Sequence, residues 1–218
     1  GVSAGAVRQD PIVVLTGDGQ ILLNGREVTE QELPGELDEL LPPGMEGERK
    51  VMFTGAGDRF FCIGGRKDGM EETMLYAGTL PTLDMYDSID RLQKPTIAMV
   101  NGYAVGGGNV LQMVCDLTIA KESAVFRQVG PMMGSFDAGY GTWYLEDLVG
   151  KKKAKEMWFA NPKLSAQEAL SLGLINRVVA DDELKDTTRE WALEIADTDA
   201  KSRYSTWKYL AEGTFGKV

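Results

Sequence analysis

The chain has 218 residues, of which 43% are hydrophobic and 26% are charged, and its formal net charge is −10. This composition is typical of a globular domain with a sizeable core, and the acidic excess argues against nucleic-acid binding, which needs clustered cations. The sequence contains no histidine, which excludes imidazole bases, Ser-His-Asp and Cys-His systems and histidine-ligated zinc, and it predicts no metal site.

The sequence predicts one domain over residues 1–218, with strands and helices alternating up to residue 150 and a mainly helical part over residues 151–218. No apolar run approaches the roughly 18 residues that a membrane span needs. No signal peptide opens the chain. Cys62 and Cys115 lie in apolar surroundings and are expected to be reduced. We therefore expect a cytoplasmic protein with no membrane or nucleic-acid partner.

The first half of the chain predicts a hairpin followed by a buried sheet. Residues 12–16 and 21–23 alternate apolar runs with a Gly-Asp-Gly turn, which indicates two paired strands. Residues 29–33 and 36–41 favour helix, interrupted by Pro34-Gly35 and ended by Pro42-Pro43. Further strands are predicted at residues 50–53, 96–100 and 117–120 with helices between them, a spacing that favours a largely parallel sheet.

The second half predicts mainly helices. Ser165 and Glu168 have the spacing of a capping box, and Gly173 is a plausible stop for the helix that follows. Residues 175–179 predict a short strand. Residues 181–197 predict an amphipathic helix, and residues 203–212 a last one.

Two glycine-rich segments each follow a predicted strand. Residues 51–65 end in Gly64-Gly65, and residues 96–109 contain the triple glycine 106–108, which opens a predicted helix. A glycine leaves its N–H open to a ligand, and a helix N-terminus adds positive potential. Either segment alone fits a tight turn, but together they predict two N–H donors for one developing oxyanion.

The sequences of these two segments, and of residues 126–142 and 152–158, resemble those of the crotonase (enoyl-CoA hydratase/isomerase) superfamily. The resemblance covers roughly residues 51–179, and is greatest to 1,4-dihydroxy-2-naphthoyl-CoA synthases and 2-ketocyclohexanecarboxyl-CoA hydrolases. It implies an α/β crotonase-like (ClpP/crotonase) fold of stacked ββα units with C-terminal helices. It also implies that Gly65 and Gly107 donate to the carbonyl oxygen of an acyl thioester.

Two absences argue against an ordinary enoyl-CoA hydratase. Hydratases of this superfamily carry two glutamates that activate water, and the matching positions here are Val110 and Gly130. The resemblance to the naphthoyl-CoA synthases assigns substrate contact and proton transfer to Ser135 and Asp137 instead. From the residues alone, Asp137 serves equally well as a turn or capping aspartate.

Glycine at position 130 also resembles one class of those synthases, in which bound bicarbonate replaces a side-chain base. The matching ion contacts here are Gln128, Gly130 and Trp158. Val129 departs from the pattern, because the synthases usually have threonine there. Trp158 fits core packing as well as it fits an ion contact.

Three functions remain open. Intramolecular Claisen ring closure, as in the synthases, is the leading one. Val129 and Asn109 resemble the ring-cleaving β-diketone hydrolase instead, whereas Phe136 follows the synthase. The third is a non-catalytic crotonase-fold subunit that binds a partner enzyme or a carrier protein.

The resemblance places further residues at the substrate. Expected contacts are Ile63, Arg66, Tyr76, Tyr140 and Arg26, the last from a reduced CoA-binding element at residues 24–29. Relatives are expected to continue past the position of Val218 into helices that carry a catalytic tyrosine, for which Tyr76 and Tyr140 are candidate substitutes. The implied substrate handle is CoA, or the pantetheine arm of an acyl-carrier protein, with no tightly bound cofactor. The implied assembly is a homotrimer or hexamer.

Overall fold

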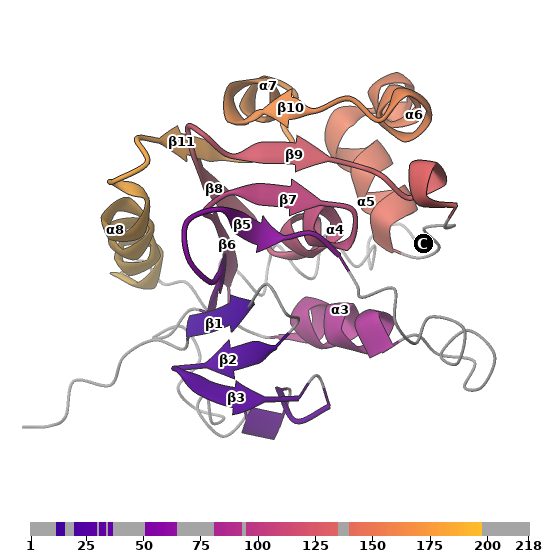
Figure 1. The fold of residues 1–218 in the computed structure, drawn as a ribbon. Coiled ribbons are helices and arrows are strands. Elements are labelled where there is room, and N and C mark those ends of the chain that lie inside the picture. The colour runs from indigo at the N-terminus through magenta and orange to yellow at the C-terminus, as the bar shows by residue number, and fades with distance from the viewer. Residues whose placement is uncertain are drawn as a thin grey trace, which may run out of the picture.

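The computed structural model describes residues 12–15, 20–29, 31–33, 35–36, 51–64, 81–92, 95–134 and 140–197. Two sheets run through this part of the chain (Figure 1). The larger sheet has the strand order β11-β8-β6-β4-β1-β2-β3. Its strands, in chain order, are β1 (Ile12–Leu15), β2 (Ile21–Leu23), β3 (Arg26–Val28), β4 (Val51–Gly55), β6 (Thr96–Val100), β8 (Leu117–Lys121) and β11 (Arg177–Val179).

The larger sheet confirms the predicted hairpin and parallel core. β1 pairs antiparallel with β2, with Val13 opposite Leu23. From β1 through β4, β6 and β8 to β11 every pairing is parallel. Residues 51–55 are all buried, as expected for a strand covered on both faces. The strand predicted over residues 175–179 is two residues shorter at its start.

A second sheet was not predicted. It contains β5 (Phe60–Cys62), β7 (Tyr103–Val105), β9 (Val125–Arg127) and β10 (Leu164–Ser165). β5, β7 and β9 are parallel, and their arrowheads in Figure 1 point to the same side of the molecule. The β5–β7 pairing is irregular: Phe60 pairs with Tyr103, but Cys62 pairs with Ala104. β7 lies between the turn at residues 101–102 and the triple glycine, and the sequence did not indicate it because a three-residue strand is too short to show a period-two pattern.

Helix α4 (Gly107–Val114) lies between the two sheets. It contacts β7 and β5 of the smaller sheet and β8 and β6 of the larger one. Seven of its eight residues are buried. A helix that is apolar on most of its circumference needs such a position. The N-terminus of α4 is thereby fixed at the edge where β5 and β7 end.

The other helices in the described ranges lie over the sheets (Figure 1). They are α3 (Pro81–Arg91), the 3₁₀ turn η1 (Pro131–Met133), α5 (Tyr140–Val149), α6 (Lys151–Ala160), α7 (Ala166–Ser171) and α8 (Leu184–Asp197). α7 begins with the predicted capping box, in which Ser165 and Glu168 bond reciprocally. α8 packs Leu184 and Trp191 against Met52, Ile97 and Ile119 of the larger sheet. No helix in the described ranges is long and apolar enough to cross a membrane. The helix predicted at residues 203–212 and residues 37–41 lie outside the described residues.

Candidate active site

The two glycine-rich strand ends meet at one edge of the smaller sheet. Gly64 follows β5 with a φ of +93°, a conformation that favours glycine. A Cβ atom added to Gly64 would lie 3.2 Å from the backbone nitrogen of Gly107. The segments ending at Gly64 and starting at Gly106, which are 42 positions apart in the sequence, are therefore in direct contact. Gly65, the other predicted donor, lies outside the described residues.

The backbone around Gly107 is arranged to present its N–H group. Gly106 has φ 57° and ψ −121°, and its N–H donates to the carbonyl oxygen of Arg127 at 2.9 Å. Gly107 is the first residue of α4, so its N–H has no acceptor within the helix. The helix dipole places partial positive charge at the same point. This N–H can therefore serve a carbonyl oxygen that becomes negative.

Gly108 fixes where α4 starts. A Cβ atom at this position would lie 1.8 Å from the carbonyl oxygen of Cys62, at the end of β5. That oxygen belongs to the backbone of a paired strand, so it cannot rotate away as a flexible side chain could. Only glycine allows α4 and β5 to approach this closely.

Replacing Gly108 by alanine is expected to destabilise the fold by about 3 kcal/mol, because the added methyl group must push β5 and α4 apart. The free energy of unfolding in urea measures this. Gly35→Ala is the matched control: a Cβ atom there has nothing within 4 Å. The control should remain within about 1 kcal/mol of the unmodified protein. Equal stability of the two variants would contradict the close contact.

The two positions at which hydratases carry glutamate are apolar in this structure. Val110 is 4% exposed and belongs to the main core, and Gly130 is buried just before η1. Val129 lies beside the glycine turn, with Cγ2 3.2 Å from the position of a Cβ atom at Gly106. At these three positions the described residues supply no group that transfers a proton.

Three glutamates near these positions in the sequence are all exposed. Glu146 pairs with Lys151 at 3.4 Å, and Glu156 with Lys153 at 2.7 Å. Glu122 lies in the turn between β8 and β9. Within the described part of the chain, no group of three or more Cys, Asp and Glu side chains is placed to hold a metal ion.

Gln128 is completely buried at the end of β9. Its Oε1 accepts a hydrogen bond from Nδ2 of Asn109 at 3.0 Å, and Oδ1 of Asn109 accepts from Nε2 of Gln112 at 3.2 Å. Thr118 of β8 extends this chain of buried polar groups by donating to Oε1 of Gln112 at 2.9 Å. The amides tie β9, α4 and β8 together. Trp158, on α6, is partly buried and packs against the main core.

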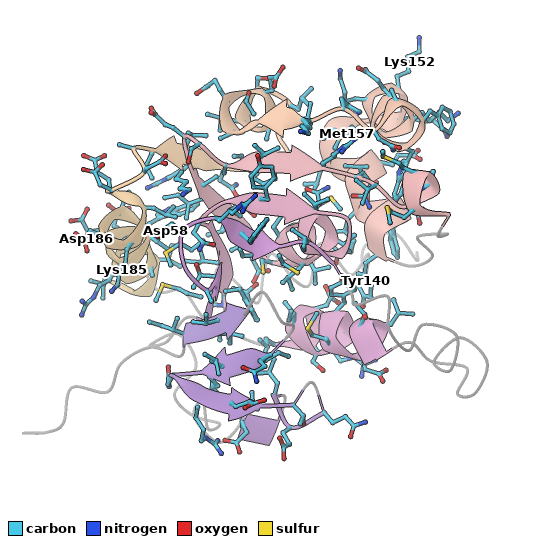
Figure 2. The ribbon with its side chains drawn as sticks, in the orientation of Figure 1. Asp58, Tyr140, Lys152, Met157, Lys185 and Asp186 are labelled. Atoms are coloured by element: carbon cyan, nitrogen blue, oxygen red, sulfur yellow. The ribbon has the colours of Figure 1, made fainter. Side chains whose placement is uncertain are left out.

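The structure places Tyr140, a predicted substrate contact, between α5 and α3 (Figure 2). Its hydroxyl donates to Oδ1 of Asp87 on α3 at 2.5 Å. Burial, and then this hydrogen bond, raise the pKa of Tyr140 well above its ordinary value. The Tyr140 proton is therefore held by Asp87 in this conformation.

The other predicted contacts are dispersed or lie outside the description. Ile63 follows β5 directly and is 53% exposed beside the glycine turn. Arg26 lies on β3 in an ion pair with Glu36, and its side chain is 63% exposed. The remaining predicted site residues lie outside the described residues: Arg66, Tyr76, Ser135 and Asp137.

Sequence reasoning missed Tyr86, and gave Asn109 no structural role. Asn109 and Gln112 lie one helical turn apart on a buried face of α4, and polar residues in such places signal a hydrogen-bonded partner. Tyr86 of α3 donates to the carbonyl oxygen of Gly107 at 2.9 Å. No sequence pattern indicates that bond, because its acceptor is a backbone atom 21 residues away.

A family model described as enoyl-CoA hydratase/isomerase matches residues 43–211. The chain belongs to this family. Its fold is the crotonase fold, and the similar structures below agree with the two sheets described above.

Three solved structures illustrate the likeness. An enoyl-CoA hydratase from Bacillus anthracis is 27% identical with a TM-score of 0.68, and the match covers 96% of this chain and 92% of that one. A monofunctional enoyl-CoA isomerase from M. smegmatis is 30% identical with a TM-score of 0.68, covering 84% and 78%. A structure named as enoyl-CoA hydratase subunit I from Geobacillus kaustophilus HTA426 is 30% identical with a TM-score of 0.67, covering 78% of this chain and 65% of that one. This chain thus spans just under two thirds of the length of that last relative.

Proposed function

We propose that this protein is an acyl-thioester enzyme that forms or cleaves a C–C bond next to the thioester carbonyl, through an enolate. The observation that carries the proposal is the contact between the two glycine-rich strand ends, with the N–H of Gly107 at the start of α4. An enolate concentrates negative charge on the thioester oxygen. Each preorganised donor to such an oxygen is typically worth about 2.7–4 kcal/mol in the transition state.

The side chains around the glycines favour C–C bond chemistry over hydration. Water addition to a double bond needs a group that activates the water and a group that delivers a proton. Val110 and Gly130, the positions that carry these groups in hydratases, can do neither. Two of the similar solved structures are named as hydratases, and that activity is said of those proteins. The reaction proposed here differs from theirs because it does not add water to a double bond.

In the proposed mechanism, the N–H groups of Gly65 and Gly107 bind the thioester oxygen. Asp137 takes or returns the proton beside the carbonyl, and Ser135 orients the acyl chain. A bicarbonate ion at Gln128, Gly130 and Trp158 stays a prediction from the resemblance. No step passes through it, because Gln128 is fully buried and already bonded to Asn109, and Val129 lacks a hydroxyl.

Ring closure by Claisen condensation, as in the naphthoyl-CoA synthases, is the first candidate reaction. Cleavage of a cyclic β-diketone is the second, because it releases the same kind of enolate and needs the same donors. Asn109 and Val129, which resemble the hydrolase, support this second candidate: Asn109 is buried in the first turn of α4, and Val129 lies beside Gly106. We propose CoA or a carrier-protein pantetheine as the substrate handle and a homotrimer or hexamer as the assembly.

The test is a titration of the protein with acetoacetyl-CoA, followed by ultraviolet difference spectroscopy. We expect an enolate absorption band that saturates with ligand, because two N–H donors stabilise the enolate over the ketone. Butyryl-CoA, which lacks the second carbonyl, should compete for binding without giving the band. Binding without the band would overturn the enolate mechanism. The absence of both binding and the band would rule out CoA as the substrate handle. It would favour a carrier-protein substrate or a non-catalytic subunit.

A further inference from the structure

Tyr86 connects helix α3 to the residue that is proposed to hold the thioester oxygen. Its side chain is 5% exposed, and its hydroxyl donates to the carbonyl oxygen of Gly107 at 2.9 Å. Tyr86 therefore lies close to the proposed reaction, but its hydroxyl bonds to a backbone carbonyl and not to the carbonyl of a substrate.

The bond matters because glycine has no side chain to pack and its backbone has more freedom than that of any other residue. The neighbours of Gly107 are held independently. Gly106 is held by its hydrogen bond to Arg127, and Gly108 by its contact with the carbonyl oxygen of Cys62. The Gly106 carbonyl oxygen, in the peptide that carries the Gly107 N–H, accepts from the Val110 N–H at 3.1 Å. The Tyr86 hydroxyl restrains the next peptide, between Gly107 and Gly108, from outside both sheets.

Tyr86 is in turn held in place by aromatic neighbours on α5. Its ring meets the ring of Tyr140 edge-on, with centroids 5.9 Å apart and an interplanar angle of 72°. The Tyr140 ring lies 5.5 Å from that of Tyr144. The hydroxyls of Tyr140 and Tyr144 donate to Asp87 and Asp90 of α3, respectively. The hydroxyl of Tyr86, in contrast, donates to α4.

We propose that Tyr86 is a positioning residue: its bond fixes the Gly107–Gly108 peptide, and through the Gly107 Cα it restrains the preceding peptide, whose N–H points at the developing oxyanion. This inference rests on the proposed function. A donor that is already aligned needs no reorganisation when charge develops, and that is the source of its catalytic effect. Loss of the Tyr86 hydroxyl should therefore weaken enolate formation more than it weakens binding of the ground-state thioester.

The experiment compares Tyr86→Phe with Tyr144→Phe. Both variants remove one tyrosine hydroxyl that bonds α3 to a neighbouring helix. The hydroxyl of Tyr86 bonds to Gly107 on α4, whereas that of Tyr144, on α5, bonds to Asp90. We expect Tyr86→Phe to lower the acetoacetyl-CoA enolisation constant about three- to tenfold, as for one hydrogen bond. The dissociation constant of butyryl-CoA should change less than twofold. Tyr144→Phe should leave the enolisation constant unchanged.

A second measurement does not depend on activity. Hydrogen exchange of the backbone amides in the peptide spanning residues 103–111 should be faster in Tyr86→Phe than in Tyr144→Phe. Both variants are measured without ligand, under conditions that give them the same free energy of unfolding. If the unmodified protein binds acetoacetyl-CoA without forming the enolate, the proposed function fails, and the hydrogen-exchange comparison alone tests whether Tyr86 restrains Gly107. If the enolate forms and the two variants behave alike, the positioning role of Tyr86 is overturned.

Discussion

Replacing Gly107 by proline is expected to lower the rate of enolate formation about 10²–10³-fold, because proline has no N–H to donate to the thioester oxygen. Gly107 is the first residue of α4, where proline is tolerated, since the N–H there makes no bond within the helix. The fold should therefore survive the substitution. The rate of enolate formation is measured as the exchange of the α-protons of acetoacetyl-CoA with deuterium oxide, after the uncatalysed rate is subtracted.

Gly107→Ala provides the matched control, since it adds a side chain but keeps the N–H. The alanine variant should retain most of the enolate band and the proline variant should lose it, while both keep the circular dichroism spectrum of the unmodified protein. An enolate band of normal intensity in Gly107→Pro would show that this N–H is not a donor.

Asp137→Asn is expected to reduce turnover about 10²–10⁴-fold, the usual contribution of a positioned acid or base. Of the other residues considered for this role, none in the described part of the chain offers a free carboxylate at the glycines. Val110 and Gly130 supply no carboxylate, and Glu146 and Glu156 are exposed and paired with lysines. Asp137 itself lies outside the described residues, and its role comes from the resemblance. Proton exchange should fall while the dissociation constant of butyryl-CoA stays within about threefold, because the amide keeps the shape of the carboxyl group.

Asp147→Asn is the control for Asp137→Asn. Asp147 is an exposed aspartate on α5, so its neutralisation changes the net charge by the same amount without touching the glycine turn. Full exchange activity in Asp137→Asn would exclude Asp137 as the proton carrier. Equal losses in both variants would point to a general effect of charge.

The sequence predicted those parts of the fold that depend on local signals. Apolar runs bounded by turn residues predicted the hairpin β1–β2 and the parallel strands β4, β6 and β8. The Ser165–Glu168 capping box was predicted from two residues, because both partners of each bond lie within one helical turn. The triple glycine correctly predicted where α4 begins. The approach of the two glycine-rich segments was predicted from the resemblance and from their similar form, and it is seen at Gly64, where an added Cβ atom would lie 3.2 Å from the Gly107 nitrogen.

What the sequence could not predict depends on partners that are distant along the chain. The strands of the smaller sheet are two or three residues long, and they gain stability from pairing with one another. Gln128 was interpreted as an ion contact from its position in a motif, whereas its bond to Asn109 spans 19 residues. Tyr86 contacts a backbone oxygen, which any sequence would provide. Composition and spacing carry no information on such contacts.

The irregular pairing of β5 with β7 decides which residues face each other at the site. Phe60 is level with Tyr103, but Cys62 is level with Ala104, so β5 uses one residue more than β7 over the same length. Counting on from Cys62 and Ala104 brings Gly64 level with Gly106, and the next residues in the two segments are Gly65 and Gly107. With a regular pairing, Gly64 would instead fall level with Gly107. The extra residue lies at Phe61, which is 1% exposed in the core. The alignment of Gly64 with Gly106 is thus set by an extra residue buried in the core, so substitutions at the surface of the glycine turn would leave that alignment in place.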